Sequence, residues 1–333
     1  NMINLKKIGL TALAGSLVAI SANAVEMSVS GSSEISYVSK NGTGIGGNVV
    51  TGNPWGSNTS ISFSGSGDVG FGTASITRTL NDGLGTHLSQ WTKIDMGDMG
   101  TLSFDSSGGG LEGLTANDDT LPTAYEEAWN GNSTSGISGA ASNDTWGYSN
   151  TFMGIGLSLA HSKGGTAGTG DQGTDGEGLT GSTTDVFLSH SGMIDGLTLG
   201  FGHSDAELKD GLTTTTGSQT MMAIVKYAMG PVSLGYQMAE VDSGAAGTAT
   251  VDIDGYSIAF NVNDNLSVSY GRYDKETTSI AGSTAVTEQN TGISGAYTSG
   301  AATVRFTNNE ADNAGGVTGV TKEHTEVSLV LAF

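Results

Sequence analysis

The sequence predicts an all-β fold, a 16-stranded antiparallel β-barrel that crosses a membrane. Three observations predict it: an N-terminal export segment, a period-two alternation of apolar and polar residues, and connections that alternate between short and long. Glycine accounts for 54 of 333 residues and proline for only 3. Because glycine weakens helices but suits turns and bends, the composition also favours strands.

The N-terminal segment predicts a cleaved signal peptide. Lys6 and Lys7 precede an uncharged run over residues 8–20, and small residues follow, ending in Ala22-Asn23-Ala24. The run is too short to span a bilayer as a helix, and the small-x-small ending favours cleavage after Ala24. We therefore expect residues 1–24 to be removed and residues 25–333 to form a single barrel domain.

Composition argues against several classes of function. The chain has no cysteine, so neither disulfides nor thiol chemistry is expected. When the two signal lysines are left out, 33 acidic residues face 10 of the 12 basic ones. This acidic balance argues against nucleic acid and anionic lipid as partners and favours a cationic solute. The five histidines are scattered and no GxSxG or HExxH motif occurs, so no enzyme is expected.

The alternation is clearest in the first and last strands expected. In the first, the apolar residues are Met27, Val29, Ile35 and Tyr37, and the polar set is Glu26, Ser28, Ser30, Ser32, Glu34 and Ser36. In the last, Thr325, Val327, Leu329, Leu331 and Phe333 share one face, and His324, Glu326, Ser328 and Ala332 share the other. Each strand thus has one apolar and one polar face. A soluble β-sandwich is an alternative that shows the same alternation.

The order of connections separates the two alternatives. Seven tight turns are predicted at 65–69, 96–99, 153–154, 192–196, 229–231, 262–265 and 298–300. Eight longer polar segments lie near 39–56, 81–87, 105–143, 163–183, 205–217, 242–250, 275–286 and 308–321. Eight hairpins joined by seven turns give 16 strands, the even number that a bacterial membrane barrel requires. Closure also pairs every backbone group in the hydrocarbon layer.

Three segments resemble the general bacterial porins of Gram-negative bacteria, especially the alphaproteobacterial type. They are Lys93–Asp105 (KIDMGDMGTLSFD), Gly230–Gln237 (GPVSLGYQ) and the C-terminal strand ending in Phe333. The resemblance implies a homotrimer in the outer membrane, in contact with its lipid and lipopolysaccharide. It implies a water-filled barrel for passive diffusion of small hydrophilic solutes, with a long third loop folded into the lumen. It also implies that Phe333 is the signal read by the barrel assembly machinery.

The third loop, expected over residues 105–143, is the candidate pore constriction. Its acidic residues are Asp105, Glu112, Asp118, Asp119, Glu126 and Glu127, and it contains no lysine or arginine. An acidic lining concentrates cations and repels anions, to an extent that salt reduces. We therefore expect mild cation selectivity. The alternative is that these carboxylates only solvate an external loop.

Basic residues are scarce on the predicted lumen wall. By strand parity Glu34, Lys226 and Arg305 face inward. Arg78 and Arg272 face outward on strict alternation, unless a bulge or a trimer contact turns them inward, and Lys93 has mixed neighbours. This scarcity departs from the basic cluster with which the family usually opposes its acidic loop.

The fourth loop is the weakest candidate for a ligand site. Asp171, Asp175 and Glu177 resemble a calcium loop, but the twelfth position from Asp171 is Ser182 rather than glutamate. A solvated acidic loop without a cofactor is the default, and divalent ions that bridge acidic loops to lipopolysaccharide stay an open alternative. A substrate-selective channel and a non-conducting surface adhesin are the alternative functions. Most tyrosines and tryptophans fall on the apolar parity, which favours a membrane-interface girdle over a sugar track.

Overall fold

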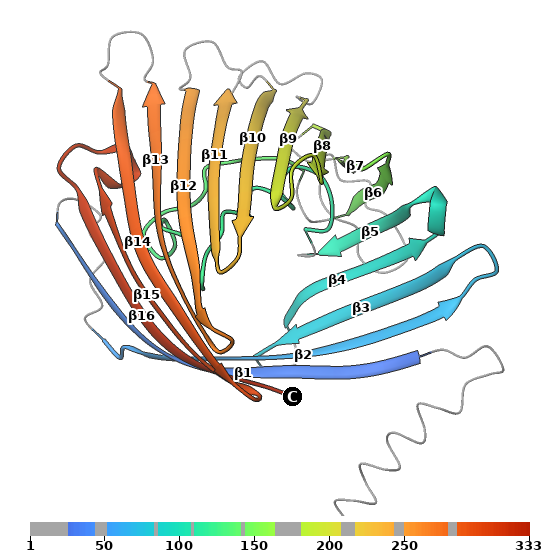
Figure 1. Ribbon diagram of the computed structural model, residues 1–333, viewed down its shortest axis with the longest axis horizontal. Coiled ribbons are helices and arrows are strands. Elements are labelled where there is room, and N and C mark those ends of the chain that lie inside the picture. Colours follow the sequence, from blue (N-terminus) through green and yellow to red (C-terminus); the bar gives the residue numbers. More distant parts are fainter. Residues whose placement is uncertain are drawn as a thin grey trace, which may run out of the picture.

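The computed structural model describes residues 26–43, 52–82, 86–107, 110–140, 144–163, 181–207, 217–242, 250–278 and 285–333. These residues form 16 antiparallel strands in one sheet that closes on itself, which confirms the predicted barrel (Figure 1). The strands are β1 (Glu26–Thr43), β2 (Trp55–Asp68), β3 (Thr73–Asn81), β4 (Thr86–Asp95), β5 (Thr101–Ser107), β6 (Thr145–Phe152), β7 (Ile155–Ser162), β8 (Thr183–Ser191), β9 (Leu197–Ala206), β10 (Ser218–Met229), β11 (Val232–Asp242), β12 (Thr250–Asn263), β13 (Leu266–Thr278), β14 (Val286–Ser299), β15 (Ala302–Asp312) and β16 (Thr321–Ala332). The predicted signal peptide lies outside the described residues.

The two faces of the strands are inverted relative to a soluble protein. Apolar side chains point outward and are exposed, as Val29 at 57 % and Phe201 at 50 % show. Polar side chains point inward and many are buried, with Asn290 and Thr307 both at 0 %. A soluble sandwich buries its apolar parity. The inversion is therefore the arrangement expected for a barrel surrounded by lipid.

The barrel closes between its first and last strands. β1 and β16 pair from Ser32↔Ala332 to Thr43↔Thr321. The C-terminal residue continues the ladder, because the Phe333 N–H donates to the Gly31 carbonyl at 2.9 Å and the Gly31 N–H donates back at 2.8 Å. No edge of the sheet is left between these two strands, as closure requires.

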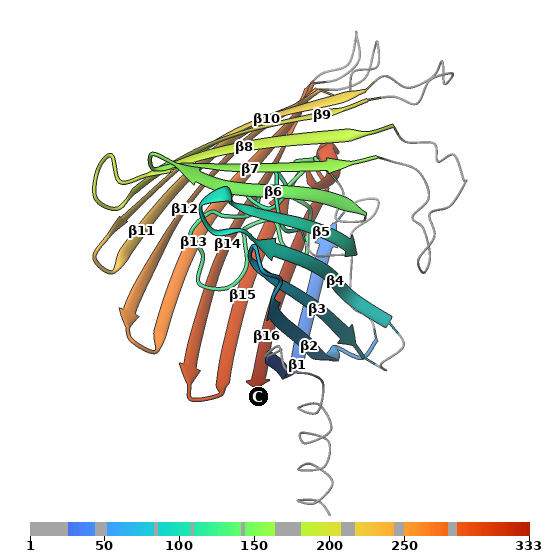
Figure 2. The ribbon, with the colours of Figure 1, turned by 90° about the vertical axis from the view of Figure 1, so that its right-hand side faces the viewer.

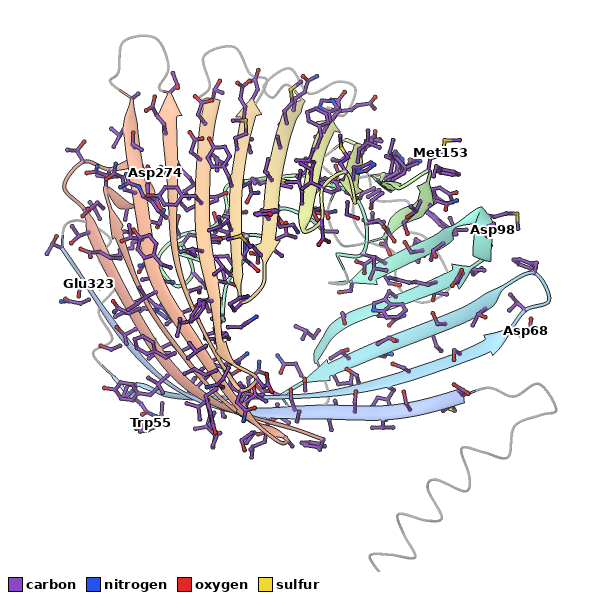
Figure 3. The ribbon with its side chains drawn as sticks, in the orientation of Figure 1. Trp55, Asp68, Asp98, Met153, Asp274 and Glu323 are labelled. Carbon is purple, nitrogen blue, oxygen red and sulfur yellow. The ribbon has the colours of Figure 1, made fainter. Side chains whose placement is uncertain are left out.

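Short turns and long connections alternate along the chain as predicted. Figure 2 shows the tilted strands, and in Figure 3 Asp68, Asp98 and Met153 mark short turns on one side of the view. Two predicted turns are displaced. The first lies at 69–72 instead of 65–69, because Ser66 and Asp68 still pair with β3. The seventh lies after Ser299 rather than at 298–300, since Thr298 still pairs with Thr303.

The buried apolar cluster lies inside the barrel. Leu114, Leu121 and Trp129 come from residues 110–140, and they pack with Phe187, Met222, Ile224, Ile253 and Tyr273, which point inward from β8, β10, β12 and β13. The segment between β5 and β6, called here the third loop, is therefore packed against the lumenal face of the sheet. Figure 2 shows this segment, in green, running through the inside of the barrel. None of the helices in the described ranges is long and apolar enough to cross a membrane.

Candidate pore constriction

Two buried aspartates fix the root of the third loop. Asp105, at the end of β5, is 3 % exposed and accepts hydrogen bonds from the N–H groups of Ser107 (3.0 Å) and Gly110 (2.6 Å). Asp185 on β8 is fully buried and accepts from the N–H groups of Leu114 (3.1 Å) and Ala140 (2.9 Å). Because Leu114 lies on the incoming arm and Ala140 on the outgoing arm, one carboxylate holds both arms of the loop together.

The loop then crosses the lumenal face of β10–β14 on polar side chains. Gln237 Nε2 donates to the Asp118 carbonyl at 2.8 Å. The hydroxyls of Ser269 and Ser294 accept from the N–H groups of Ala124 (2.9 Å) and Tyr125 (3.1 Å). Inward serines and glutamine of the wall thus satisfy loop backbone groups that would otherwise be buried without partners.

Two wall glycines allow the loop to lie this close. A Cβ added at Gly235 on β11 would overlap the ring of Pro122. One added at Gly255 on β12 would lie 3.0 Å from Leu121 and 2.6 Å from the Tyr273 ring. Any larger residue at either position would lift the loop from the wall.

The far end of the loop is held by three lysines that the sequence did not single out. Lys40 on β1 donates to the Gly131 carbonyl (3.1 Å) and Lys322 on β16 to the Asn132 carbonyl (3.2 Å). Lys275 on β13 donates to the Ser133 hydroxyl (2.5 Å) and the Thr134 carbonyl (2.9 Å), and lies 3.6 Å from Glu288. We call these three side chains the lysine latch.

Asparagine and aromatic contacts reinforce the latch. Asn309 Nδ2 donates to the carbonyls of Glu127 and Asn130, both at 2.9 Å. The Trp129 ring packs on the Tyr273 ring with centroids 4.2 Å apart, and the Tyr273 hydroxyl donates to the Ser135 carbonyl. The loop is therefore fixed at its root, across its middle and at its far end.

Four predicted carboxylates lie together on the middle of the loop. Asp119 is exposed, whereas Asp118, Glu126 and Glu127 are half-buried. Burial raises the pKa of Asp118 to about 6, against the hydrogen bond that its carboxylate accepts from Ser135. Burial is also the main cause that raises the pKa of Glu126. We call Asp118, Asp119, Glu126 and Glu127 the acidic edge.

Glu127 lies beside Asp119 and forms a side-chain hydrogen bond with it. Burial first, and then the hydrogen bond and the charge of Asp119, raise the pKa of Glu127 to about 9. At neutral pH Glu127 is therefore protonated, and its O–H donates a hydrogen bond to Asp119. The acidic edge carries less negative charge than its count of carboxylates suggests.

Asp105 and Glu112, which were predicted at the constriction, belong elsewhere. Asp105 is a buried part of the root. Glu112 faces the wall, where its Oε1 accepts from the Ser149 hydroxyl (3.0 Å) and its Oε2 from the Ser158 hydroxyl (2.7 Å). Alternation cannot place residues of an irregular loop, so no sequence pattern separates these two residues from the acidic edge.

The wall formed by β1–β3 carries hydroxyls. Inward side chains hydrogen-bond across the strands as Ser32–Ser60 (3.0 Å), Ser62–Thr79 (2.8 Å) and Ser64–Thr77 (2.9 Å). On the next strand, β4, Lys93 shares the face of Trp91, with its Nζ 5.2 Å from the Trp91 ring. Trp91 pairs with Thr77, so both face the lumen. The sequence left the orientation of Lys93 open, and the structure places its side chain on the inward face.

The other charged residues predicted on the wall, Glu34, Lys226 and Arg305, face inward as the alternation predicts. Arg305 and Glu34 form an ion pair at 2.5 Å, and the Arg305 guanidinium lies 4.2 Å from the centre of the Tyr125 ring. The Tyr125 hydroxyl donates to Glu326, which lies 3.5 Å from His324. Lys226 lies on the inward parity of β10, between Thr198 and Gly235 on the neighbouring strands. These contacts tie the middle of the loop to β15, β16 and β1.

Arg78 and Arg272 face outward, as strict alternation predicts. Arg78 is exposed beside Phe63 and Gln90 on the neighbouring strands. Arg272 binds Asp274, also outward, at 2.8 Å. Neither arginine reaches the lumen. The predicted calcium candidates Asp171, Asp175 and Glu177 lie outside the described residues, and within the ranges described no group of three His, Asp or Glu side chains is placed to hold a metal ion.

Comparisons with known proteins agree with this architecture. Residues 9–330 match the family model described as Gram-negative porin. A porin structure refined at 1.8 Å resolution is 13 % identical, with a TM-score of 0.66 over 92 % of this chain and 100 % of that one. The anion-selective porin of Comamonas acidovorans is 13 % identical, with a TM-score of 0.65 over 93 % of this chain and 100 % of that one. OmpF of Salmonella typhi, in complex with daunomycin, is 11 % identical, with a TM-score of 0.63 over 92 % and 97 %. No curated protein matches the sequence.

The family match covers nearly the whole chain, so the protein belongs to the Gram-negative porin family. It is an outer-membrane β-barrel channel for small solutes. At 11–13 % identity the solved structures support the fold alone.

The two buried N–H groups at Asp185 give a test of how the loop is held. We expect Asp185→Ala to leave the Leu114 and Ala140 N–H groups unpaired, at a cost of about 1–3 kcal/mol each. The thermal unfolding temperature should fall, and the single-channel conductance should become larger and noisier as the loop leaves the wall. Asp205→Ala, an exposed and outward change on the next strand, should alter neither. Wild-type conductance in Asp185→Ala would show that the loop does not depend on this carboxylate.

Proposed function

We propose that this porin is a passive diffusion channel with a mild preference for cations. The observation that supports the proposal is that most inward basic side chains are already bound to other groups of the protein. Lys40, Lys275 and Lys322 are bound to the third loop, and Arg305 is paired with Glu34. Among the described inward lysines and arginines, Lys93 and Lys226 are the two that bind neither the third loop nor a carboxylate.

The acidic edge supplies the opposing charge. Asp119 is exposed, and Asp118 is ionised above pH 6. The β1–β3 wall adds neutral hydroxyls and no further base. Carboxylates beside a narrow aqueous path raise the local concentration of cations. Fold alone does not set this preference, since an anion-selective porin is among the similar structures.

Catalysis is not part of the proposal. The described histidines lie on separate strands, with His161 on β7, His190 on β8, His203 on β9 and His324 on β16. Of these, His161, His190 and His203 lie on the outward parity of their strands. Such an arrangement offers no grouped acid, base and nucleophile.

The first test is single-channel conductance in planar bilayers, with reversal potentials under a KCl gradient. We expect stepwise openings and a cation-favouring reversal potential. A unit charge near an ion's path changes its energy by about 0.5–1 kcal/mol in water. Asp119→Asn should therefore lower the cation-to-anion permeability ratio about two- to fivefold.

Glu127→Gln is the matched control. The glutamine amide donates to Asp119 as the protonated carboxyl does, so the permeability ratio at pH 7 should stay close to that of wild type. An anion-favouring reversal potential in wild type would overturn the proposed preference. Absence of any conductance would instead favour the non-conducting adhesin.

The permeability ratio should also depend on pH. Asp118 loses its charge as pH falls through about 6, so acidification from pH 7.5 to 5 should lower the ratio by about a factor of two. The sign for stability is opposite. Burial favours the protonated carboxyl, so its stabilising contribution is present at low pH and is lost as pH rises through about 6. In Asp118→Asn the step in reversal potential near pH 6 should disappear, and a persisting step would assign it to another group.

We further propose that three copies associate through the outward face of β1–β4. A hollow of 710 Å³ on this face is lined by Met27, Phe63, Gly65, Ile76 and Arg78. Exposing arginine to lipid costs up to about 2–4 kcal/mol near the bilayer midplane, whereas a protein contact can supply polar partners. Small residues, together with an arginine that forms no ion pair with another described residue, favour contact with another copy over contact with lipid.

A bulky outward residue tests this face. A Cβ at Gly65 would meet only ordinary contacts, the nearest at 3.7 Å from Ile76. Gly65→Trp should therefore leave the barrel intact but convert a three-chain assembly in mild detergent to single chains. Gly295→Trp, outward on β14 with its nearest contact at 3.5 Å, should leave the assembly unchanged. A wild-type protein that is monomeric by light scattering would contradict the proposal.

Export and assembly complete the proposal. Removal of residues 1–24 would deliver the chain to the outer membrane, with β1 beginning at Glu26. Phe333 is 75 % exposed although its backbone pairs with Gly31, so its ring is accessible to the assembly machinery. Outward tyrosines such as Tyr236 and Tyr256 supply amphipathic contacts for lipid and lipopolysaccharide headgroups.

A further inference from the structure

A polar cavity of 510 Å³ lies in the lumen wall beneath the incoming arm of the third loop. It lies against β5–β8, beside the turn that joins β4 to β5, and its volume is within the range of about 300–1,000 Å³ typical of small-molecule sites. An inference about it rests on the proposed function, since solutes reach it only through an open lumen.

Small inward residues hollow out this part of the wall. Ala116, Ser149, Gly156, Ser158 and Ser189 line the cavity. A Cβ at Gly156 would lie 2.5 Å from the Ser189 hydroxyl, so only glycine leaves this space open without moving the serine. The cavity is therefore a consequence of residue size and not of a gap between strands.

Glu112 determines the chemistry of the cavity. No base among the described residues pairs with its carboxylate, and both of its oxygens accept serine hydroxyls. Ser149 and Ser158 direct their protons at Glu112, so their oxygens act as acceptors, and the Ser158 oxygen already accepts the Gly113 N–H at 2.8 Å. Asn117 likewise directs its Nδ2 at the Gly113 carbonyl, at 2.8 Å, and keeps its own carbonyl oxygen as an acceptor.

The surplus of acceptors selects one class of solute. A primary ammonium group has three N–H donors and no acceptor, so it complements a carboxylate surrounded by oxygen acceptors. A polyol would need as many donors as acceptors from the wall. A sugar would also gain from an open aromatic face, but Phe187 is 5 % exposed and offers little ring surface.

We propose that this cavity is a binding subsite for the primary ammonium group of small organic cations, with Glu112 as its anchor. The subsite lies beside the short turn that joins β4 to β5, where Gly97 and Gly100 line it. Short turns mark the periplasmic end of bacterial membrane barrels. A cation that passes the acidic edge can therefore pause there without meeting the lysine latch.

The test uses 1,4-diaminobutane as the probe and the neutral 1,4-butanediol as its control, in planar bilayers with the purified protein. The diamine should lower single-channel current in a saturable manner, and the diol should not. Glu112→Gln should raise the half-blocking concentration of the diamine at least tenfold. A non-saturable effect, or the same half-blocking concentration in Glu112→Gln, would overturn the subsite.

A second variant separates filling of the cavity from loss of its charge. Ala116→Leu fills the cavity and keeps Glu112, so it should also raise the half-blocking concentration of the diamine. Reversal potentials in KCl alone, taken from the same channels, report on the proposed cation preference independently of the diamine. If no channel conducts, titration calorimetry of 1,4-diaminobutane into detergent-solubilised wild type and Glu112→Gln decides on the subsite, with unchanged binding counting against it.

Discussion

The pairing of backbone groups is the constraint on which the rest of this structure depends. In hydrocarbon an unpaired N–H or C=O costs several kcal/mol, so the sheet has to close, and β1 closes on β16 down to the backbone pair of Gly31 and Phe333. Closure fixes which parity meets lipid and which meets water. The inward parity is therefore polar for a reason unrelated to any solute.

The same constraint explains how an irregular loop is kept inside the barrel. Its backbone groups need partners too, and the polar inward side chains supply them: Asp185 at the root, Ser269 and Ser294 across the middle, and the lysine latch at the far end. The polar side chains that make the lumen wall hydrophilic thus also form the hydrogen bonds that the loop backbone needs. This double use explains why most inward bases are not available to face the solute.

Period-two alternation was sufficient to predict the barrel, its strand number and the inward position of Glu34, Lys226 and Arg305, because parity is a local property of a strand. It failed where a residue's partner is distant in sequence. Lys275 meets Thr134 across 141 residues, and Asp185 meets Leu114 across 71. Strand residues with such loop partners look like any other polar position. Inside the loop, no period distinguishes Asp105 at the root from Asp119 on the edge.

The lysine latch has a consequence for how such a channel can change. Within the loop, Lys40 and Lys322 donate only to main-chain carbonyls, and Lys275 donates to one main-chain carbonyl and one serine hydroxyl. Main-chain oxygens are present whatever the side chain, so the Thr134 side chain can be exchanged without removing the bond from Lys275. Gly131 is fixed for another reason, because its φ is 78° and a Cβ there would overlap the His324 ring. The scaffold and the surface that the solute meets are thereby under separate control. Substitutions in the acidic edge, natural or designed, can therefore change which solutes pass while the lysine latch keeps the loop in the same place.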